Sequence, residues 1–107
     1  MNKLASDIYE NSLTHGFWDF PDPSETTRSL FISQKLALIH SEVSEAVEEH
    51  RKHPSHFSVK GPFEEELADI IIRTLDLCGY LGINIESLIV AKHEKNKARP
   101  HRHNKRF

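Results

Sequence analysis

Four acidic side chains occur in two pairs with matching spacing. Glu42 and Glu45 are three residues apart in one predicted helix, and Glu66 and Asp69 are three residues apart in the next. Because positions i and i+3 share a face of an α-helix, each pair directs two carboxylates the same way. Oxygen-only ligands select hard cations, chiefly Mg²⁺ with Mn²⁺ as a substitute, and these ions often bridge to substrate phosphates. The acids therefore predict a Mg²⁺ site formed by both helices.

The surroundings of the second pair favour this interpretation. Glu66, Asp69, Arg73 and Asp76 form one narrow polar stripe on a helix that is otherwise apolar nearly all round, as a buried helix is. The apolar residues are Leu67, Ala68, Ile70, Ile71, Ile72, Leu75, Leu77 and Cys78. An unpaired buried carboxylate is strongly unfavourable, so the stripe requires compensating cations. Arg73 offsets only one of the four site charges.

The first pair borders a predicted core stripe in a helix over residues 23–52. That stripe comprises Ile32, Leu36, Ile39, Val43, Ala46 and Val47. Phe31 and Leu38 share a second face with Glu45 and Glu49, so these carboxylates border apolar surface. An ion-paired, solvated face is the alternative interpretation. A di-iron bundle is disfavoured, because no Glu is followed by His three residues later.

The positions of Pro, Gly and capping residues predict the elements that carry these acids. A short first helix, with Leu4, Ile8 and Leu13 as its apolar residues and Ala5 alongside them, stops near Gly16. We expect three further helices, over residues 23–52, 63–80 and 85–99. Asp22 and Pro23 open the second helix, Pro62 suits the first position of the third, and Asn84 caps the fourth. No segment alternates as a strand does. The chain is thus predicted to be a single all-α domain over residues 1–107, resembling a four-helix bundle.

Composition limits the setting of the protein. Its 107 residues fit one small domain with a thin core, and the single cysteine, Cys78, excludes an internal disulfide. No apolar run approaches the roughly 18 residues of a membrane span, and the N-terminus lacks a signal peptide, so a cytoplasmic protein is expected. Seven of the 14 Lys and Arg residues fall in the last sixteen positions. This segregation suggests a polyanion bound between an acidic centre and a basic tail.

Four sequence blocks together resemble a known enzyme family. HGFWD, KLALIHSEVSEAVEEHRK, FEEELADIIIRTLDLCGYLGI and KHEKNKARPHRH occur in the order found in MazG-like all-α nucleoside triphosphate pyrophosphohydrolases, whose signature is Glu-x-x-Glu, a spacer, then Glu-x-x-Asp. The resemblance implies that Glu42, Glu45, Glu66 and Asp69 bind catalytic Mg²⁺. It also implies hydrolysis of nucleoside triphosphates, usually deoxynucleotides, to monophosphate and pyrophosphate in nucleotide-pool cleaning or balancing. Family members assemble as homodimers or homotetramers.

Further roles follow from the resemblance and from residue chemistry. Glu45, or its neighbour Glu42, is expected to orient or deprotonate the attacking water. Lys92, Lys95, Asn96 and Arg99 in the fourth helix are expected to grip the phosphates, with a solvated helix end as the alternative. Asn104 stands in the tail where the family commonly has glycine.

Two aromatic residues are also candidates for substrate contact. Trp18 either stacks on a base or closes a small core, because loop aromatics do both. Tyr80 continues the polar stripe of the third helix and is expected to border the pocket.

The competing function is that of a non-enzymatic helical module whose basic tail binds nucleic acid. The internal acids argue against it, since a binding module has no need of them. Nucleic acid is therefore not the expected partner.

Overall fold

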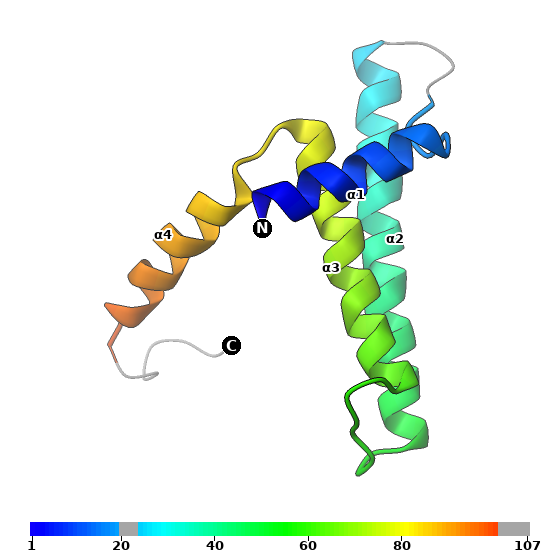
Figure 1. Ribbon diagram of the computed structural model, residues 1–107, viewed down its shortest axis with the longest axis vertical. Helices are drawn as coiled ribbons and strands as arrows, with labels where there is room; N and C mark the ends of the chain where they lie inside the picture. Colours follow the sequence, from blue (N-terminus) through cyan, green and yellow to red (C-terminus); the bar gives the residue numbers. More distant parts are fainter. Residues whose placement is uncertain (20–23, 101–107) are drawn as a thin grey trace.

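Two long antiparallel helices form the centre of the molecule (Figure 1). The computed structural model describes residues 1–19 and 24–100. Within these residues there is no strand, and the helices are α1 (Asn2–Thr14), α2 (Glu25–Lys52), α3 (Pro62–Leu81) and α4 (Ile85–Lys97). α3 packs along α2 on one side and against α1 on another. The prediction of an all-α chain with four helices is confirmed.

The helix termini show which local signals act. Ser24 is the N-cap of α2, and its hydroxyl accepts a hydrogen bond from the Thr27 amide at 3.2 Å. Asn84 caps α4 as predicted, accepting from the Ser87 amide. Gly82 ends α3 in the left-handed region at a φ of 68°, which glycine adopts without strain.

Some predicted features lie outside the described residues. They are the start of the second helix at Asp22 and Pro23, and the tail turn at Asn104.

α1 crosses α3 at very close range. A methyl group on Gly79 would lie 2.5 Å from Cβ of Tyr9 and 3.2 Å from the backbone oxygen of Ala5, so only glycine fits this crossing. The buried residues of α1 are Ala5 and Ser12, whereas the predicted apolar residues Leu4 and Leu13 are exposed. The prediction of a helix was right, and of its predicted apolar residues Ala5 is buried and Ile8 half-buried. The expected burial of Leu4 and Leu13 was wrong, because the small residues allow this close contact.

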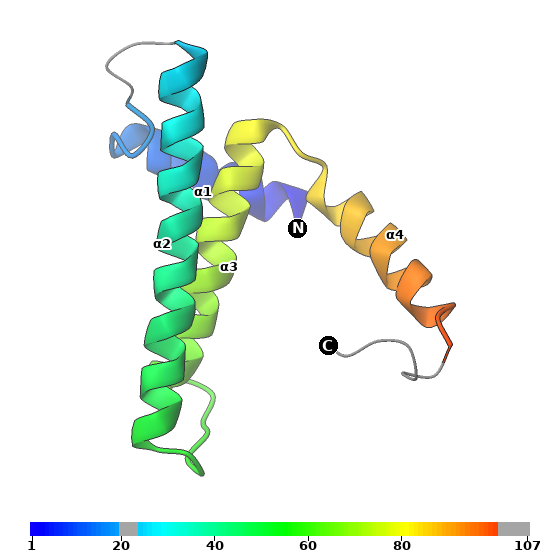
Figure 2. The same cartoon turned by 180° about the vertical axis from the view of Figure 1, so that it is seen from behind.

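The predicted core stripe of α2 is only partly covered. Ala46 is buried, but Leu36, Val43 and Val47 are exposed, and they follow one another at intervals of seven and four residues along one face. α1 lies on one side of the α2–α3 pair, and no other described helix covers the opposite side (Figure 2). On α3, Leu67, Ile71 and Ile72 are likewise exposed. In so short a chain, the described helices cover only one side of the α2–α3 pair, so apolar side chains of α2 and α3 remain exposed.

α4 stands apart from the other helices (Figure 1; Figure 2). The chain bends by 114° between α3 and α4. Near this bend, the Met1 ammonium pairs with Glu86 at 2.8 Å and the Asn2 amide donates to the Asn84 side chain at 2.7 Å. Hence the described helices of one chain do not close into a four-helix bundle.

No single described helix is long and apolar enough to cross a bilayer, and α3 and α4 meet the length and composition criteria only as a bent pair.

Candidate functional site

Three glutamates from two helices converge at the α2–α3 contact. Glu42 and Glu45 project from α2 and Glu66 from α3, and one carboxylate oxygen of each lies within 4.8 Å of the others. Glu42 is buried, with 8% of its surface exposed, Glu66 is half-buried, and Glu45 is exposed. The group therefore has a buried side and an open side, as a site that exchanges ligands with solvent requires.

The positive charge facing these acids is small. Nε of Arg73 lies 3.1 Å from Oε1 of Glu42, and within residues 1–19 and 24–100 this is the only ion pair made by the three glutamates. Three carboxylates and one guanidinium leave an excess of negative charge if all are ionised. A proton or a bound cation must offset that excess.

The excess of negative charge affects the pKa of Glu66. A hydrogen bond with the Glu45 carboxyl, then burial, then a hydrogen bond with Glu42 and the charges of both neighbours raise the pKa of Glu66 to about 7. One of its oxygens, Oε2, is buried and has no hydrogen-bond partner. A hard divalent cation would neutralise the carboxylates and use such a free oxygen, so these donors fit Mg²⁺ or Mn²⁺.

The raised pKa makes the stability of the metal-free protein depend on pH. The folded chain holds the Glu66 proton up to about pH 7, whereas the unfolded chain releases it near 4.5. The folded state therefore binds more protons between these values, and the free energy of unfolding falls as pH rises through this window. Melting temperatures measured in EDTA from pH 4.5 to 8 should decline more steeply for the wild type than for Glu66→Gln. Equal slopes would contradict the shift.

Asp69, the fourth predicted ligand, does not join the group. It is half-buried on α3, one turn beyond Glu66, and it lies outside the cluster whose ligand atoms meet within 4.8 Å. The i, i+3 spacing places both acids on one face, but only Glu66 belongs to the group within 4.8 Å. A role for Asp69 as a ligand remains a prediction.

Trp18 is a core residue in this structure. Only 5% of its surface is exposed, its ring stacks on Tyr80 at a centroid distance of 4.2 Å, and the ring of Tyr9 packs edge-on. Its indole N–H donates to Asp76 at 2.9 Å. Stacking of a base on Trp18 would require the Trp18–Tyr80 contact to open, so the structure agrees with the alternative in which Trp18 closes a small core.

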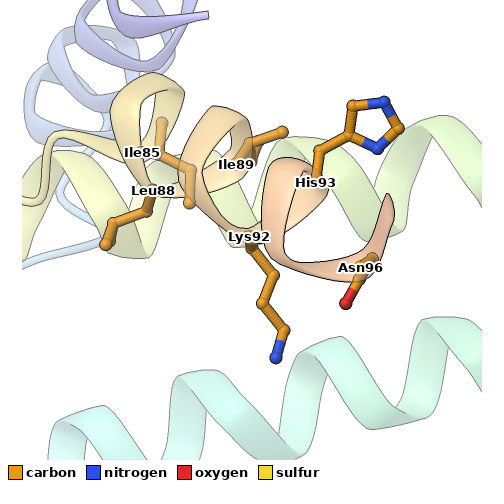
Figure 3. A pocket seen from close by; sticks show the side chains of 6 residues that line it. All are labelled: Ile85, Leu88, Ile89, Lys92, His93 and Asn96. Carbon is orange, nitrogen blue, oxygen red and sulfur yellow. The ribbon is translucent and has the colours of Figure 1, made fainter. Parts of the chain in front are cut away.

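The predicted phosphate-binding residues lie on α4 and just after it, away from the three glutamates at the α2–α3 contact. Lys92 and Asn96 line a shallow groove of about 460 Å³ on one face of α4 (Figure 3), together with Ile85, Leu88, Ile89 and His93. Lys95 is exposed on the same helix, and Arg99 follows its end. Because α4 stands apart from α2 and α3, one chain does not bring this group to the three glutamates.

A second cavity adjoins the acids, and sequence reasoning did not find it. It measures about 260 Å³ and is lined by Phe17, Lys35, Leu38, Arg73 and Asp76. Burial, together with the charge of Arg73, lowers the pKa of Lys35, although Asp76 opposes this shift. Lys35 and Leu38 precede Glu42 by seven and four residues, so all three share a helix face. This spacing is the sequence pattern that could have predicted the cavity.

The functional argument rests on these geometric observations and on the sequence motifs that carry the acidic residues. Comparison with protein-family models, with curated proteins and with solved structures finds no match to the chain.

Proposed function

We propose that the protein is a Mg²⁺-dependent nucleoside triphosphate pyrophosphohydrolase acting in the cytoplasm, with deoxynucleotides as its main substrates. The observation that carries the proposal is the convergence of Glu42, Glu45 and Glu66, with one arginine to balance them and one buried oxygen unsatisfied. The order of the sequence blocks, which resembles that of the MazG-like enzymes, supports the same assignment. Nucleotide-pool cleaning or balancing is the corresponding cellular role.

In this proposal the three glutamates would hold the metal, with Asp69 as a further candidate at the edge of the site. When bound, Mg²⁺ supplies charge neutralisation for the phosphates and lowers the pKa of water. Glu45 is the exposed member of the group, so it is best placed to accept a proton from a water that attacks the α-phosphorus. Glu42 is buried and paired with Arg73, which suits a ligand held in fixed orientation.

Product analysis tests the proposal directly. Phosphorus NMR after incubation with Mg²⁺ and a panel of ribo- and deoxynucleoside triphosphates should reveal monophosphate and pyrophosphate. Diphosphate with orthophosphate would mean cleavage at the terminal phosphorus. No turnover with either Mg²⁺ or Mn²⁺, combined with salt-sensitive DNA binding, would favour the helical binding module.

We further propose that the protein assembles as a homodimer or homotetramer. The exposed stripe Leu36, Val43 and Val47 and the groove on α4 leave apolar surface that a second copy would cover. Assembly would also offer a way to bring Lys92 and Asn96 of one copy near the glutamates of another, which one chain does not do.

The oligomer prediction has a matched pair of variants. Light scattering should give about two or four times the 12.4 kDa mass of the chain. Val43→Lys places a charge in the exposed stripe and should shift the mass toward that of one chain. Gln34→Lys, on the opposite face of α2 and equally exposed, should leave the mass unchanged. A wild-type mass of 12.4 kDa would disprove the assembly.

A further inference from the structure

The cavity beside the glutamates has the size of a subsite for part of a ligand. Its volume of about 260 Å³ lies just below the roughly 300–1,000 Å³ of sites that enclose a whole small molecule. Phe17 and Leu38 supply apolar wall, and Lys35, Arg73 and Asp76 supply polar groups. A flat ring with a polar edge would match this combination.

Lys35 is the unusual member of the lining. It is half-buried, and it makes no ion pair with an acid anywhere in the described part of the chain. Its ammonium donates one hydrogen bond, to the backbone oxygen of Phe17 at 2.9 Å, and lies 4.7 Å above the Trp18 ring. An ammonium carries three donors and no acceptor, so donor capacity remains for a ligand.

The cavity and the acidic group lie next to each other, because Arg73 lines the cavity and pairs with Glu42. Lys35, Leu38, Glu42 and Glu45 share a face of α2, at spacings of three, four and three residues. Glu66, Asp69, Arg73 and Asp76 repeat these spacings on α3. Arg73 joins the two parts, because it pairs with Glu42 and also lines the cavity. Seven residues of helix separate Lys35 from Glu42 by about 10 Å, which leaves room for a sugar and phosphates between them.

We propose that this cavity binds the base of the substrate and selects a 4-oxo pyrimidine, the ring of uracil and thymine. The inference rests on the proposed function, since it assumes that nucleotide phosphates lie at the glutamates. Lys35 and Arg73 offer only donors, and the Asp76 carboxylate offers only acceptors. The edge of a 4-oxo pyrimidine presents two carbonyl oxygens and one N–H, which this set satisfies. Cytosine replaces one carbonyl by an amino group and the N–H by an acceptor, leaving Lys35 and Asp76 mismatched.

The test compares dUMP with dCMP, two nucleotides that share sugar and phosphate and differ only in the base edge. Isothermal titration calorimetry in Mg²⁺ should give about tenfold or tighter binding of dUMP by the wild type, since a site that hydrogen-bonds its ligand rejects mismatched groups. Lys35→Met removes the ammonium but keeps the chain length. It should weaken dUMP binding about tenfold and leave dCMP binding nearly unchanged. Lys52→Met, at the other lysine of α2, should behave as the wild type.

Several results would overturn the inference. Three of them are equal wild-type affinity for the two nucleotides, no binding of either nucleotide, and a preference for dUMP that survives Lys35→Met. The fourth is an equal loss of affinity for dUMP and dCMP in Lys35→Met, which would place a phosphate on Lys35. The wild-type comparison remains decisive if Lys35→Met does not fold. Turnover of dTTP and dCTP, measured in parallel, separates the two proposals. Hydrolysis of dTTP and dCTP without base preference would contradict only the base-selective cavity. Base preference without hydrolysis of either triphosphate would contradict only the proposed function.

Discussion

Glu66→Gln is expected to lower kcat for nucleoside triphosphate hydrolysis by about 100-fold or more. Under the proposed function, glutamine keeps the shape of the side chain but removes the charge that would bind the metal, and metal-borne charge stabilisation of a transition state amounts to several kcal/mol. A loss of about 2.7 kcal/mol corresponds to a factor of about 100 in rate. Because Glu66 lies at the α2–α3 contact with an unsatisfied oxygen, the same change should weaken Mn²⁺ binding, which electron paramagnetic resonance measures directly.

The control for this variant is Glu48→Gln. Glu48 is exposed on α2 and only loosely paired with Arg51 at 3.9 Å, so it should retain wild-type turnover and Mn²⁺ binding. Activity at the wild-type level in Glu66→Gln would remove the three-glutamate site from the mechanism. A folded variant that binds Mn²⁺ normally yet does not turn over would instead assign Glu66 to the chemical step.

Asp76→Ala is expected to be the most destabilising of the substitutions considered. Asp76 accepts hydrogen bonds from the Trp18 indole at 2.9 Å and the Ser12 hydroxyl at 2.8 Å, and both donor residues are buried. Hydrogen bonds to charged groups contribute roughly 1.5–3 kcal/mol each, so we expect a loss of about 3 kcal/mol. For a domain near 100 residues this lowers the melting temperature by roughly 10–20 °C.

Calorimetry and tryptophan fluorescence would measure this loss. Asp7→Ala is the matched control, because Asp7 pairs with Lys3 on the exposed surface of α1 at 3.2 Å and should change stability little. A melting temperature for Asp76→Ala within about 3 °C of the wild type would show that the link between α1 and α3 is not important for stability.

Much of the fold follows from local signals in the sequence. Pro62 and Asn84 mark the starts of α3 and α4, and the structure places both as predicted. The spacing of Glu42 and Glu45 also placed them on one face, and the structure brings Glu66 to the same group. Signals of this kind act within one or two helical turns, so periodicity and capping rules can detect them.

Features that depend on helix crossings were not predictable in the same way. The apolar pattern assigned Val43 and Val47 to a core, but no described element covers them. Conversely, Trp18 is buried against Tyr80 and donates its N–H to Asp76, which is 58 residues away. Periodicity identifies an apolar face, but it does not state which partner covers that face.

The glycine at the α1–α3 crossing has a consequence for how substrate choice could change. α1 ends in the segment that carries Phe17, a wall of the cavity, and Ser12 of α1 binds Asp76, another member of the lining. A methyl group at Gly79 would force α1 away from α3 and displace both. Under the proposed function, a substitution at Gly79, which contacts neither a metal ligand nor the substrate, would therefore change base selection. New specificities would be accessible to mutation through the angle between two helices, with the hydrolytic chemistry preserved.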